Sequence, residues 1–348
     1  MCMKTYKPLL LTAIAILLAI NTFAQLSAKA LVNEGVQLHD AGKFDQAIEK
    51  YKQALQAEPE NATALYEIAN TLYTIKNYND ALKNLDKLVK IQASPDAYSM
   101  YGNIYDDLKQ PDKAIDYYKK GINAFPDFQM LHFNLAIAYA RQGKYPEAAS
   151  ALIPALQLNP NHASSHRLYA MISKELKNDA DAIMACCNFL LLEPQSQRST
   201  GMYNTLQGII QSKVTKTGDK SITITVNDKK DGDESIFALE TMLSMLAASP
   251  TLEKSKGKTS TEIFQEQLDS FFRVAGELSE KKKDKTFLWK FYADYFYALA
   301  KSGNMQAFTH YISLSATDGA EHKKWLTENV APLNKLSAWV AETKHVTQ

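Results

Sequence analysis

The chain contains little cysteine. Three of its 348 residues are cysteines: Cys2, Cys186 and Cys187. Neighbouring side chains on a helix point about 100° apart, so the adjacent pair is poorly placed to form a mutual disulfide. The sequence therefore predicts a fold without a disulfide framework, in which apolar packing provides the stability and Cys186 is buried as a small apolar residue.

An excess of charge is also lacking. The 39 Lys and Arg residues are balanced by 38 Asp and Glu residues, which gives a net charge of +1. Proteins that bind nucleic acids neutralise phosphates with clustered basic side chains. Neither half of this chain contains such a cluster, so we predict no nucleic-acid partner.

Long apolar runs are absent with one exception near the start. The run from Leu9 to Ile20 has twelve residues and follows Lys4 and Lys7, whereas a membrane-spanning helix needs about 20. The pattern is typical of a secretion signal peptide over residues 1–24, cleaved after Ala24; a retained membrane helix is the alternative. We expect an exported protein without a membrane span after cleavage, located in the periplasm, with secretion or outer-membrane association as alternatives.

Sequence motifs of enzymes are missing as well. There is no glycine-rich phosphate loop, zinc-protease helix motif, serine elbow or paired-cysteine knuckle. His162 and His166 have a spacing suited to zinc, but they follow Pro160 and should straddle a helix start. We predict no catalytic residue, metal or cofactor; an active site assembled from distant parts of the C-terminal region is the alternative. Three further histidines are interpreted as surface residues: His310, His322 and His345.

A period of about 34 residues is present over half of the chain. Small residues recur at intervals of 34, 33, 34 and 34, at Gly35, Ala69, Gly102, Ala136 and Ala170. A second series follows twelve places behind, at Ala47, Ala81, Ala114, Ala148 and Ala182. Short turn-forming segments separate the two series, and two helices can approach closely where both side chains are small. Each unit is therefore predicted to be a helical hairpin.

Prolines mark the ends of four units. Pro59, Pro126, Pro160 and Pro194 follow the second helices, and proline disfavours a helical conformation in the residue before it. In the second unit Ala93 takes this place, and that unit is one residue shorter.

Eight residues of the first unit carry a family resemblance: Gly35, Leu38, Gly42, Phe44, Ala47, Tyr51, Ala54 and Pro59. This pattern resembles the tetratricopeptide repeat, and the resemblance extends over residues 28–196. It implies an all-α fold, a right-handed α-solenoid of five helix-turn-helix repeats. The expected repeats are 28–61, 62–94, 95–128, 129–162 and 163–196. Such repeats serve chaperone docking, secretion and assembly alike, so the resemblance specifies the fold far better than the function.

The resemblance also implies a binding groove, because the first helices of these repeats line the concave face. The groove positions that we select as binding residues are Tyr66, Asn70, Tyr73, Asn103, Phe133, Ile137, Arg167 and Lys174. Equivalent amides at Asn70 and Asn103 can pair with the backbone of an extended peptide. The family's carboxylate clamp is absent, because Val32, Tyr66 and Ser99 stand at its lysine positions.

Each groove assignment has an alternative. The asparagines can be tolerated on a solvated helix face, and the aromatic side chains can pack between hairpins. Arg167 and Lys174 suit an acidic group of a ligand but also an ordinary solvated surface. The expected function is a non-enzymatic scaffold that binds a protein or an extended peptide. A structural subunit of an envelope assembly, using the convex or C-terminal surface, is the alternative.

Residues after the repeats are also predicted to be mainly helical. We expect a capping helix at 197–212, a polar linker or short strand at 213–233, and a helical region at 234–348. The possible strand is the alternation from Ser221 to Val226, which has no evident ladder partner. An aromatic cluster over 287–297 covers too much of its helix for one face, which favours burial over a binding wall.

Overall fold

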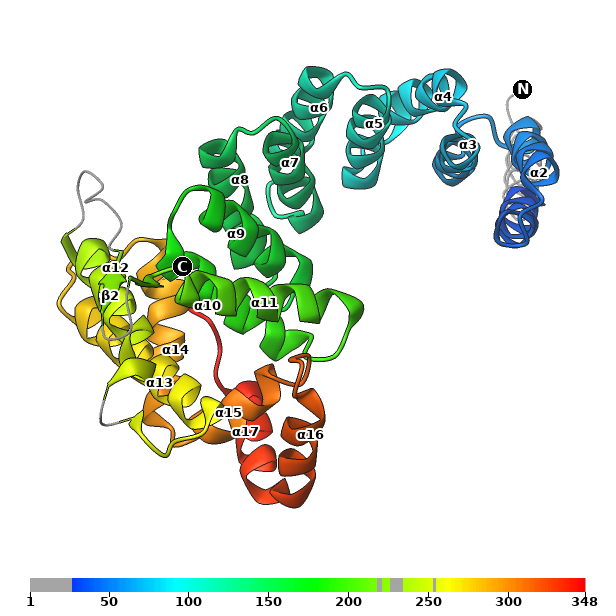
Figure 1. Cartoon of the computed structure of the whole chain (residues 1–348). Helices are drawn as coiled ribbons and strands as arrows, with labels where there is room; N and C mark the ends of the chain where they lie inside the picture. Colours follow the sequence, from blue (N-terminus) through cyan, green and yellow to red (C-terminus); the bar gives the residue numbers. More distant parts are fainter. Residues whose placement is uncertain (1–26, 218–220, 226–233, 253–254, 348) are drawn as a thin grey trace, which may run out of the picture. The chain divides into compact units, whose positions relative to one another are not determined.

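The computed structural model describes residues 27–217, 221–225, 234–252 and 255–347 (Figure 1). The predicted signal peptide at 1–24 lies outside the described residues. The chain divides into two compact units, Met1–Asn134 and Leu135–Gln348. None of the described helices is both long and apolar enough to cross a membrane.

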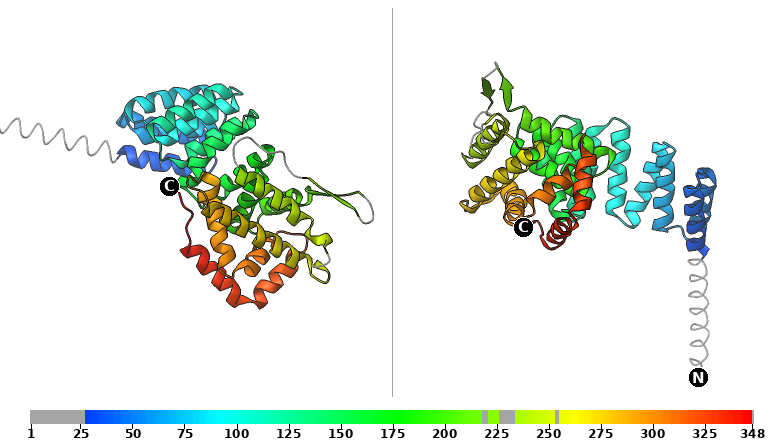
Figure 2. Two further views of the ribbon diagram at one scale, coloured as in Figure 1. Left: turned by 90° about the vertical axis from the view of Figure 1, so that its left-hand side faces the viewer. Right: turned by 60° about the horizontal axis from the view of Figure 1, so that its bottom comes forward.

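The N-terminal unit consists of paired helices, which confirms the predicted helical hairpins. A helix covers residues 27–40. It is followed by α2 (Phe44–Ala57), α3 (Ala62–Thr74), α4 (Tyr78–Ile91), α5 (Pro95–Asp107) and α6 (Pro111–Ala124). From α2 to α6, consecutive helices contact one another, and Figure 2 shows them side by side. The unit boundary falls within α7 (Gln129–Arg141).

Small residues let the two helices of a hairpin approach. A Cβ added to Gly102 would lie 2.1 Å from Cε1 of Tyr118, and one added to Gly35 would lie 2.3 Å from Cε1 of Tyr51. The tyrosine rings of the second helices therefore pack directly on the glycine backbone of the first. This contact explains why the first series of the period requires small side chains.

The turns between hairpin helices use the left-handed backbone conformation. Gly42 and Gly143 have φ angles of 72° and 71°, and Lys76, Lys109 and Lys177 have φ angles of 61°, 60° and 56°. Glycine adopts this region without steric cost, whereas other residues do not. The three lysines thus keep the turn geometry at some expense in stability.

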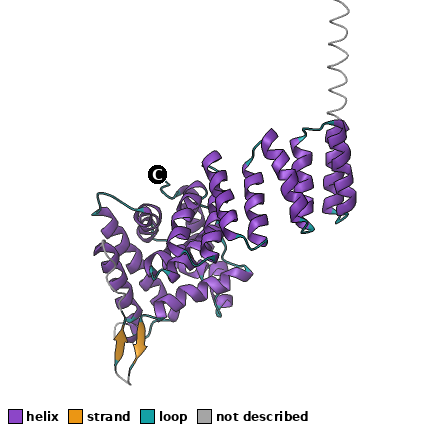
Figure 3. Ribbon diagram, turned by 90° about the horizontal axis from the view of Figure 1, so that it is seen from above, coloured by secondary structure: helices purple, strands orange, loops and turns teal. Residues whose placement is uncertain are grey.

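The C-terminal unit continues with helices and contains the two strands (Figure 3). Its elements up to the strands are α8 (Tyr145–Leu158), α9 (Ala163–Glu175), α10 (Asp179–Leu192), α11 (Gln197–Gln211), β1 (Val214–Lys216) and β2 (Ile222–Ile224). Those that follow are α12 (Glu234–Ala247), η1 (Ser249–Thr251), α13 (Ser260–Glu280), the π-helical η3 (Leu288–Ala293), α14 (Asp294–Lys301), α15 (Met305–Ile312), α16 (Gly319–Glu328) and α17 (Val330–Glu342).

Helix α10 forms the centre of this unit. Every residue from Ala180 to Leu191 is buried, including Cys186 and Cys187. The helix contacts α9, α11, α12, α15 and η3, as expected of a helix that is largely apolar. The fifth hairpin, formed by α9 and α10, and α8 before it therefore belong to the same packed unit as the helices that follow them.

The two strands form a short antiparallel pair. Val214 pairs with Ile224, Thr215 with Thr223, and Lys216 with Ile222. From the sequence, a short strand within Ser221–Val226 and a polar linker were the two alternatives. No partner strand was expected, because three residues are too few for β1 to show an alternating pattern.

The aromatic cluster is buried, as predicted. Trp289, Phe291, Tyr292 and Phe296 are fully buried. His345 stacks on Phe291 with ring centroids 4.3 Å apart. The interpretation of His322 as a surface residue is wrong, because His322 is 3% exposed. His345 is partly buried, because its ring packs against aromatic residues far away in sequence.

Candidate functional site

Three of the predicted binding residues lie on α3 of the N-terminal unit. Tyr66, Asn70 and Tyr73 are all partly exposed. The Tyr66 and Tyr73 side chains also pack against the core of the hairpins. Burial raises the pKa of Tyr66, and the negative charges of Asp96 and Glu67 add to this effect. These tyrosines therefore combine a packing role with an exposed edge.

Asn103 occupies the equivalent position on α5, which contacts α3. Its Oδ1 accepts a hydrogen bond of 2.7 Å from the Tyr118 hydroxyl on α6. Burial raises the pKa of Tyr118 far above its usual value, so this hydroxyl stays a donor. The bond fixes the amide orientation and leaves the Asn103 amino group as the part of the side chain that can meet a ligand.

Asn70 has a local partner as well. Burial raises the pKa of Glu67, and the Asn70 side chain opposes that shift by a hydrogen bond to the Glu67 carboxyl. The backbone oxygen of Asn70 accepts a bond of 2.9 Å from Thr74 Oγ1. The Asn70 amide thus interacts with the Glu67 carboxyl, while the Asn103 amide is held by a hydrogen bond before any ligand arrives.

The remaining predicted residues are Phe133, Ile137, Arg167 and Lys174. Phe133 and Ile137 lie on α7, on either side of the unit boundary, and both are partly buried. Arg167 and Lys174 lie on α9 in the C-terminal unit. The eight residues therefore fall into two sets, Tyr66 to Phe133 in one unit and Ile137 to Lys174 in the other.

Arg167 and Lys174 line a pocket of about 480 Å³ between α9 and α11. Met171 on α9, 45% exposed, contributes an apolar surface to it. Residues 167, 171 and 174 share one helix face because their spacing follows the helical period. Within the described part of the chain neither Arg167 nor Lys174 forms an ion pair, so both cations are available in the pocket.

The opposite wall of this pocket was not predicted from the sequence. It includes Arg198, Gly201 and Met202 of α11. The Arg198 guanidinium pairs with Glu193 through Nε and Oε1 at 3.0 Å, and this pairing lowers the pKa of Glu193. The sequence signal for this wall was Gly201, a glycine inside a predicted helix. In the structure, a Cβ added to Gly201 would have no neighbouring atom within 4 Å, so packing does not require glycine there.

The two histidines with zinc-like spacing are occupied by protein contacts. His166 Nε2 donates to the Pro160 carbonyl oxygen at 2.8 Å, and its Nδ1 lies 2.8 Å from the Tyr292 hydroxyl. Burial lowers the pKa of His166 to about 3. His162 Nδ1 lies 2.8 Å from Ser165 Oγ at the start of α9. No group of three or more metal-binding side chains was found among the described residues.

Burial also determines the state of the cysteines. The thiol of Cys186 lies 3.1 Å from the sulfur of Met202, and burial raises the pKa of both Cys186 and Cys187. A thiol of raised pKa is a poor nucleophile. The pair therefore serves packing in α10.

Comparisons with known proteins agree with the repeat pattern. The family model of the tetratricopeptide repeat matches residues 38–104 and 107–172. No curated protein matches the sequence.

Several solved structures are similar over about half of the chain. PilF of Pseudomonas aeruginosa is 17% identical, with 54% of this chain and 91% of that chain covered and a TM-score of 0.47. MamA is 22% identical, with 48% of this chain and 92% of that chain covered and a TM-score of 0.42. YrrB, described as a tetratricopeptide repeat protein with an unusual peptide-binding site, is 20% identical. The similarity covers 47% of this chain and 86% of that chain, with a TM-score of 0.39.

Proposed function

Because the chain is a tetratricopeptide repeat protein, we propose that it is a non-enzymatic scaffold that holds an extended peptide or a partner protein on the first helices of its repeats. The observation that carries this proposal is the pocket between α9 and α11. Arg167 and Lys174 place two cations beside the exposed thioether of Met171. This combination suits a peptide with an acidic side chain next to an apolar one.

The N-terminal unit supports the same function with different chemistry. Asn70 and Asn103 stand on successive first helices that contact each other, and the Asn103 side chain is held by an internal hydrogen bond. Fixed amides cost less entropy when they bind than mobile ones. Partly exposed rings at Tyr66 and Tyr73 add contact area for apolar side chains of the ligand.

The site of action that we propose is outside the inner membrane. This rests on the apolar run from Leu9 to Ile20 behind Lys4 and Lys7, which has the length and order of a secretion signal. Expression in a Gram-negative host should yield a periplasmic protein whose mass corresponds to cleavage after Ala24. A protein of full mass, retained in the cytoplasm, would contradict this location.

Binding can be tested with residues 25–348 and labelled heptapeptides that carry either a central glutamate or a central glutamine. We expect preference for glutamate, and we expect Arg167→Gln and Lys174→Gln each to weaken binding of the glutamate peptides about threefold to tenfold. A partly exposed charge pair is worth about 1 kcal/mol, which corresponds to this range. Added salt should reduce the preference because it screens exposed charges.

Lys323→Gln provides the matched control. Lys323 is exposed on α16; it does not line the α9–α11 pocket and does not lie on the first helix of any repeat. Its replacement therefore removes one positive charge from the same unit, as Arg167→Gln and Lys174→Gln do. Binding by Lys323→Gln should equal that of the unmodified protein. Equal affinity for glutamate and glutamine peptides, or equal losses in all three variants, would refute a specific role for the α9–α11 pocket.

A further inference from the structure

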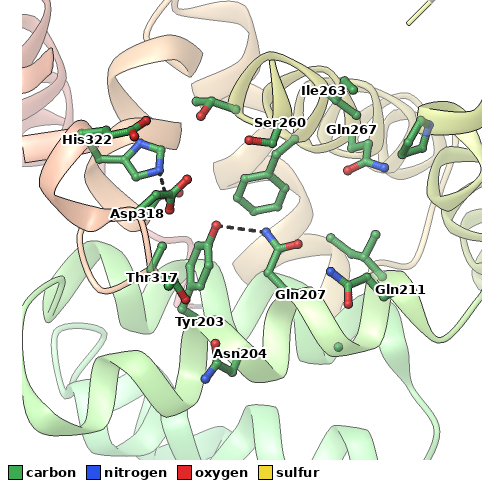
Figure 4. A pocket seen from close by; sticks show the side chains of 18 of the residues that line it. Tyr203, Asn204, Gln207, Gln211, Ser260, Ile263, Gln267, Thr317, Asp318 and His322 are labelled. Carbon is green, nitrogen blue, oxygen red and sulfur yellow. Dashed lines mark hydrogen bonds and ion pairs between the residues drawn. The ribbon is translucent and has the colours of Figure 1, made fainter. Parts of the chain in front are cut away.

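A cavity in the C-terminal unit is separate from the surfaces considered so far. Its volume is about 950 Å³, and it is lined mainly by α11, the start of α13, the segment after α15, and α16. Figure 4 shows side chains from these elements converging on it. Helix α11 therefore contributes to two pockets, with Gly201 and Met202 in the smaller one and Gln207 and Gly208 in this one.

Amide side chains form one wall of the cavity. Asn204, Gln207 and Gln211 follow one another along α11 and all line it. Gln207 and Gln211 are four residues apart, which is about 6 Å along a helix. Alternate residues of an extended peptide repeat at about 6.7 Å. Since an amide offers both a donor and an acceptor, this row can pair with successive backbone groups of an extended chain.

A fixed acceptor faces this row. Gln267 of α13 lines the cavity, and its Nε2 donates to the Leu246 carbonyl oxygen at 2.8 Å. That bond orients the amide and leaves its oxygen for other donors. Gln207 is oriented as well, because its Nε2 donates to the Tyr203 hydroxyl at 3.2 Å. The polar groups are therefore arranged before binding.

One end of the cavity is acidic. Asp318, Glu321 and His322 line it, with Asp318 Oδ1 3.4 Å from His322 Nε2. The described lining residues include no Lys or Arg. Figure 4 places Asp318 beside Tyr203, at the end of the amide row opposite Gln211. The pKa of Tyr203 is raised by burial, with a further contribution from the Asp318 charge. A cationic side chain is the complementary ligand for this end.

One hydroxyl at the cavity is buried without a well-formed hydrogen bond to the described residues. Ser313 is 0% exposed and lines the cavity. Within the described residues its Oγ has no hydrogen bond of normal geometry, although it is close enough to the Tyr203 hydroxyl to lower the pKa of that group. An unpaired buried hydroxyl is costly, so a ligand group that reaches it would be stabilised there.

The helix backbone is also open to a ligand at this wall. Gly208 lies within α11 and lines the cavity, and no atom lies within 4 Å of a Cβ added to it. Alanine would be the better helix former at such a position. No contact among the described residues requires glycine at position 208. A peptide lying on α11 would require it, because a side chain there would occupy the space of the peptide.

We propose that this cavity is a second peptide-binding site, which takes an extended segment along Asn204, Gln207 and Gln211 with a lysine or arginine side chain at Asp318. It differs from the proposed repeat surface in position and in charge, because the α9–α11 pocket is basic. The two sites can therefore be tested independently, and failure of one leaves the other standing.

The test uses residues 25–348 and fluorescence polarisation with labelled heptapeptides of serine, threonine and valine around a central lysine. Three sets of comparison peptides are measured in parallel. The first has a central norleucine, the second a central glutamate, and the third is the lysine peptides with N-methylated backbone amides. We expect lysine to bind at least fivefold more tightly than norleucine. N-methylation should weaken binding about tenfold, because it removes the backbone N–H donors that the amides of α11 are proposed to bind.

Two variants connect binding to the cavity. Gly208→Ala should weaken lysine-peptide binding at least tenfold while the protein stays folded, and Asp318→Asn should abolish the preference of lysine over norleucine. Thr200→Ala is the control, since Thr200 is exposed on the same helix and lines neither pocket; it should leave binding unchanged. Undiminished binding by Gly208→Ala, preference for glutamate, or binding of a labelled maltotetraose but of no peptide would overturn the proposal.

Discussion

Replacement of Gly102 by alanine tests how the hairpins are packed. The added methyl group would lie 2.1 Å from Cε1 and 2.3 Å from Cζ of Tyr118, far inside normal contact distance. Tyr118 is 2% exposed, so its ring can move only by leaving its site and breaking the 2.7 Å bond to Asn103. Overpacking costs about 1–3 kcal/mol and the lost hydrogen bond about 1 kcal/mol.

A gain partly offsets this cost. Alanine is a better helix former than glycine by about 1 kcal/mol. The free energy of unfolding of the N-terminal unit should therefore fall by roughly 1–3 kcal/mol. In the background of Tyr118→Leu, where the ring is absent, Gly102→Ala should instead stabilise the protein. This change of sign separates ring overlap from any general intolerance of α5 to substitution.

Two signals separate the units in a urea titration. The three tryptophans, Trp289, Trp325 and Trp339, all lie in the C-terminal unit, so tryptophan fluorescence follows that unit. Far-ultraviolet circular dichroism follows helices of both units. Gly102→Ala should shift an early part of the dichroism transition and leave the fluorescence transition in place. An unchanged dichroism transition would refute the close approach of α5 and α6.

Three further results are expected. Lys76→Gly should raise the free energy of unfolding by about 1 kcal/mol and Gly143→Ala should lower it by a similar amount in urea titrations, because both positions have positive φ. Burial raises the pKa of Glu240 to about 7, so the folded state favours its neutral form. The contribution of Glu240 to stability is fully present below the unfolded pKa of about 4.3 and is lost as pH rises through 7. The free energy of unfolding should therefore fall by up to roughly 3 kcal/mol over this range. In a pH profile of stability monitored by tryptophan fluorescence, Glu240→Gln should remove this fall. Gly201→Ala should raise the melting temperature and weaken binding of glutamate peptides to the α9–α11 pocket, and unchanged binding would mean that ligands do not reach this wall.

The fold of the repeats could be predicted because it depends on local patterns. The period of small residues marks contacts between helices that are neighbours in sequence, such as Gly102 with Tyr118. Turn positions such as Lys109 were recognisable from their place between the two series, although the cost of a positive φ at a lysine was not visible. The expected burial of Cys186 within α10 is likewise confirmed.

The sites depend on contacts that no sequence pattern records. Asn103 was selected for its position, but its bond to Tyr118 decides which of its groups can meet a ligand. The larger cavity combines Gln207 of α11 with Gln267 of α13 and Asp318 in the turn before α16, residues that share no period. The partial burial of His345 was not predicted for the same reason, since its partners Asn188 and Phe291 lie far away in sequence.

The place of His345 has a consequence for the order of folding. Its Nε2 lies 3.1 Å from Oδ1 of Asn188, 157 positions earlier, and the Thr347 carbonyl oxygen accepts a bond from Gln157, 190 positions earlier. The aromatic core of the C-terminal unit therefore cannot close during synthesis until residues 345–347 have been added. The N-terminal unit needs only neighbouring hairpins and can assemble progressively. Contacts of such long range also slow folding, so the two halves of one chain should reach their native states on different timescales.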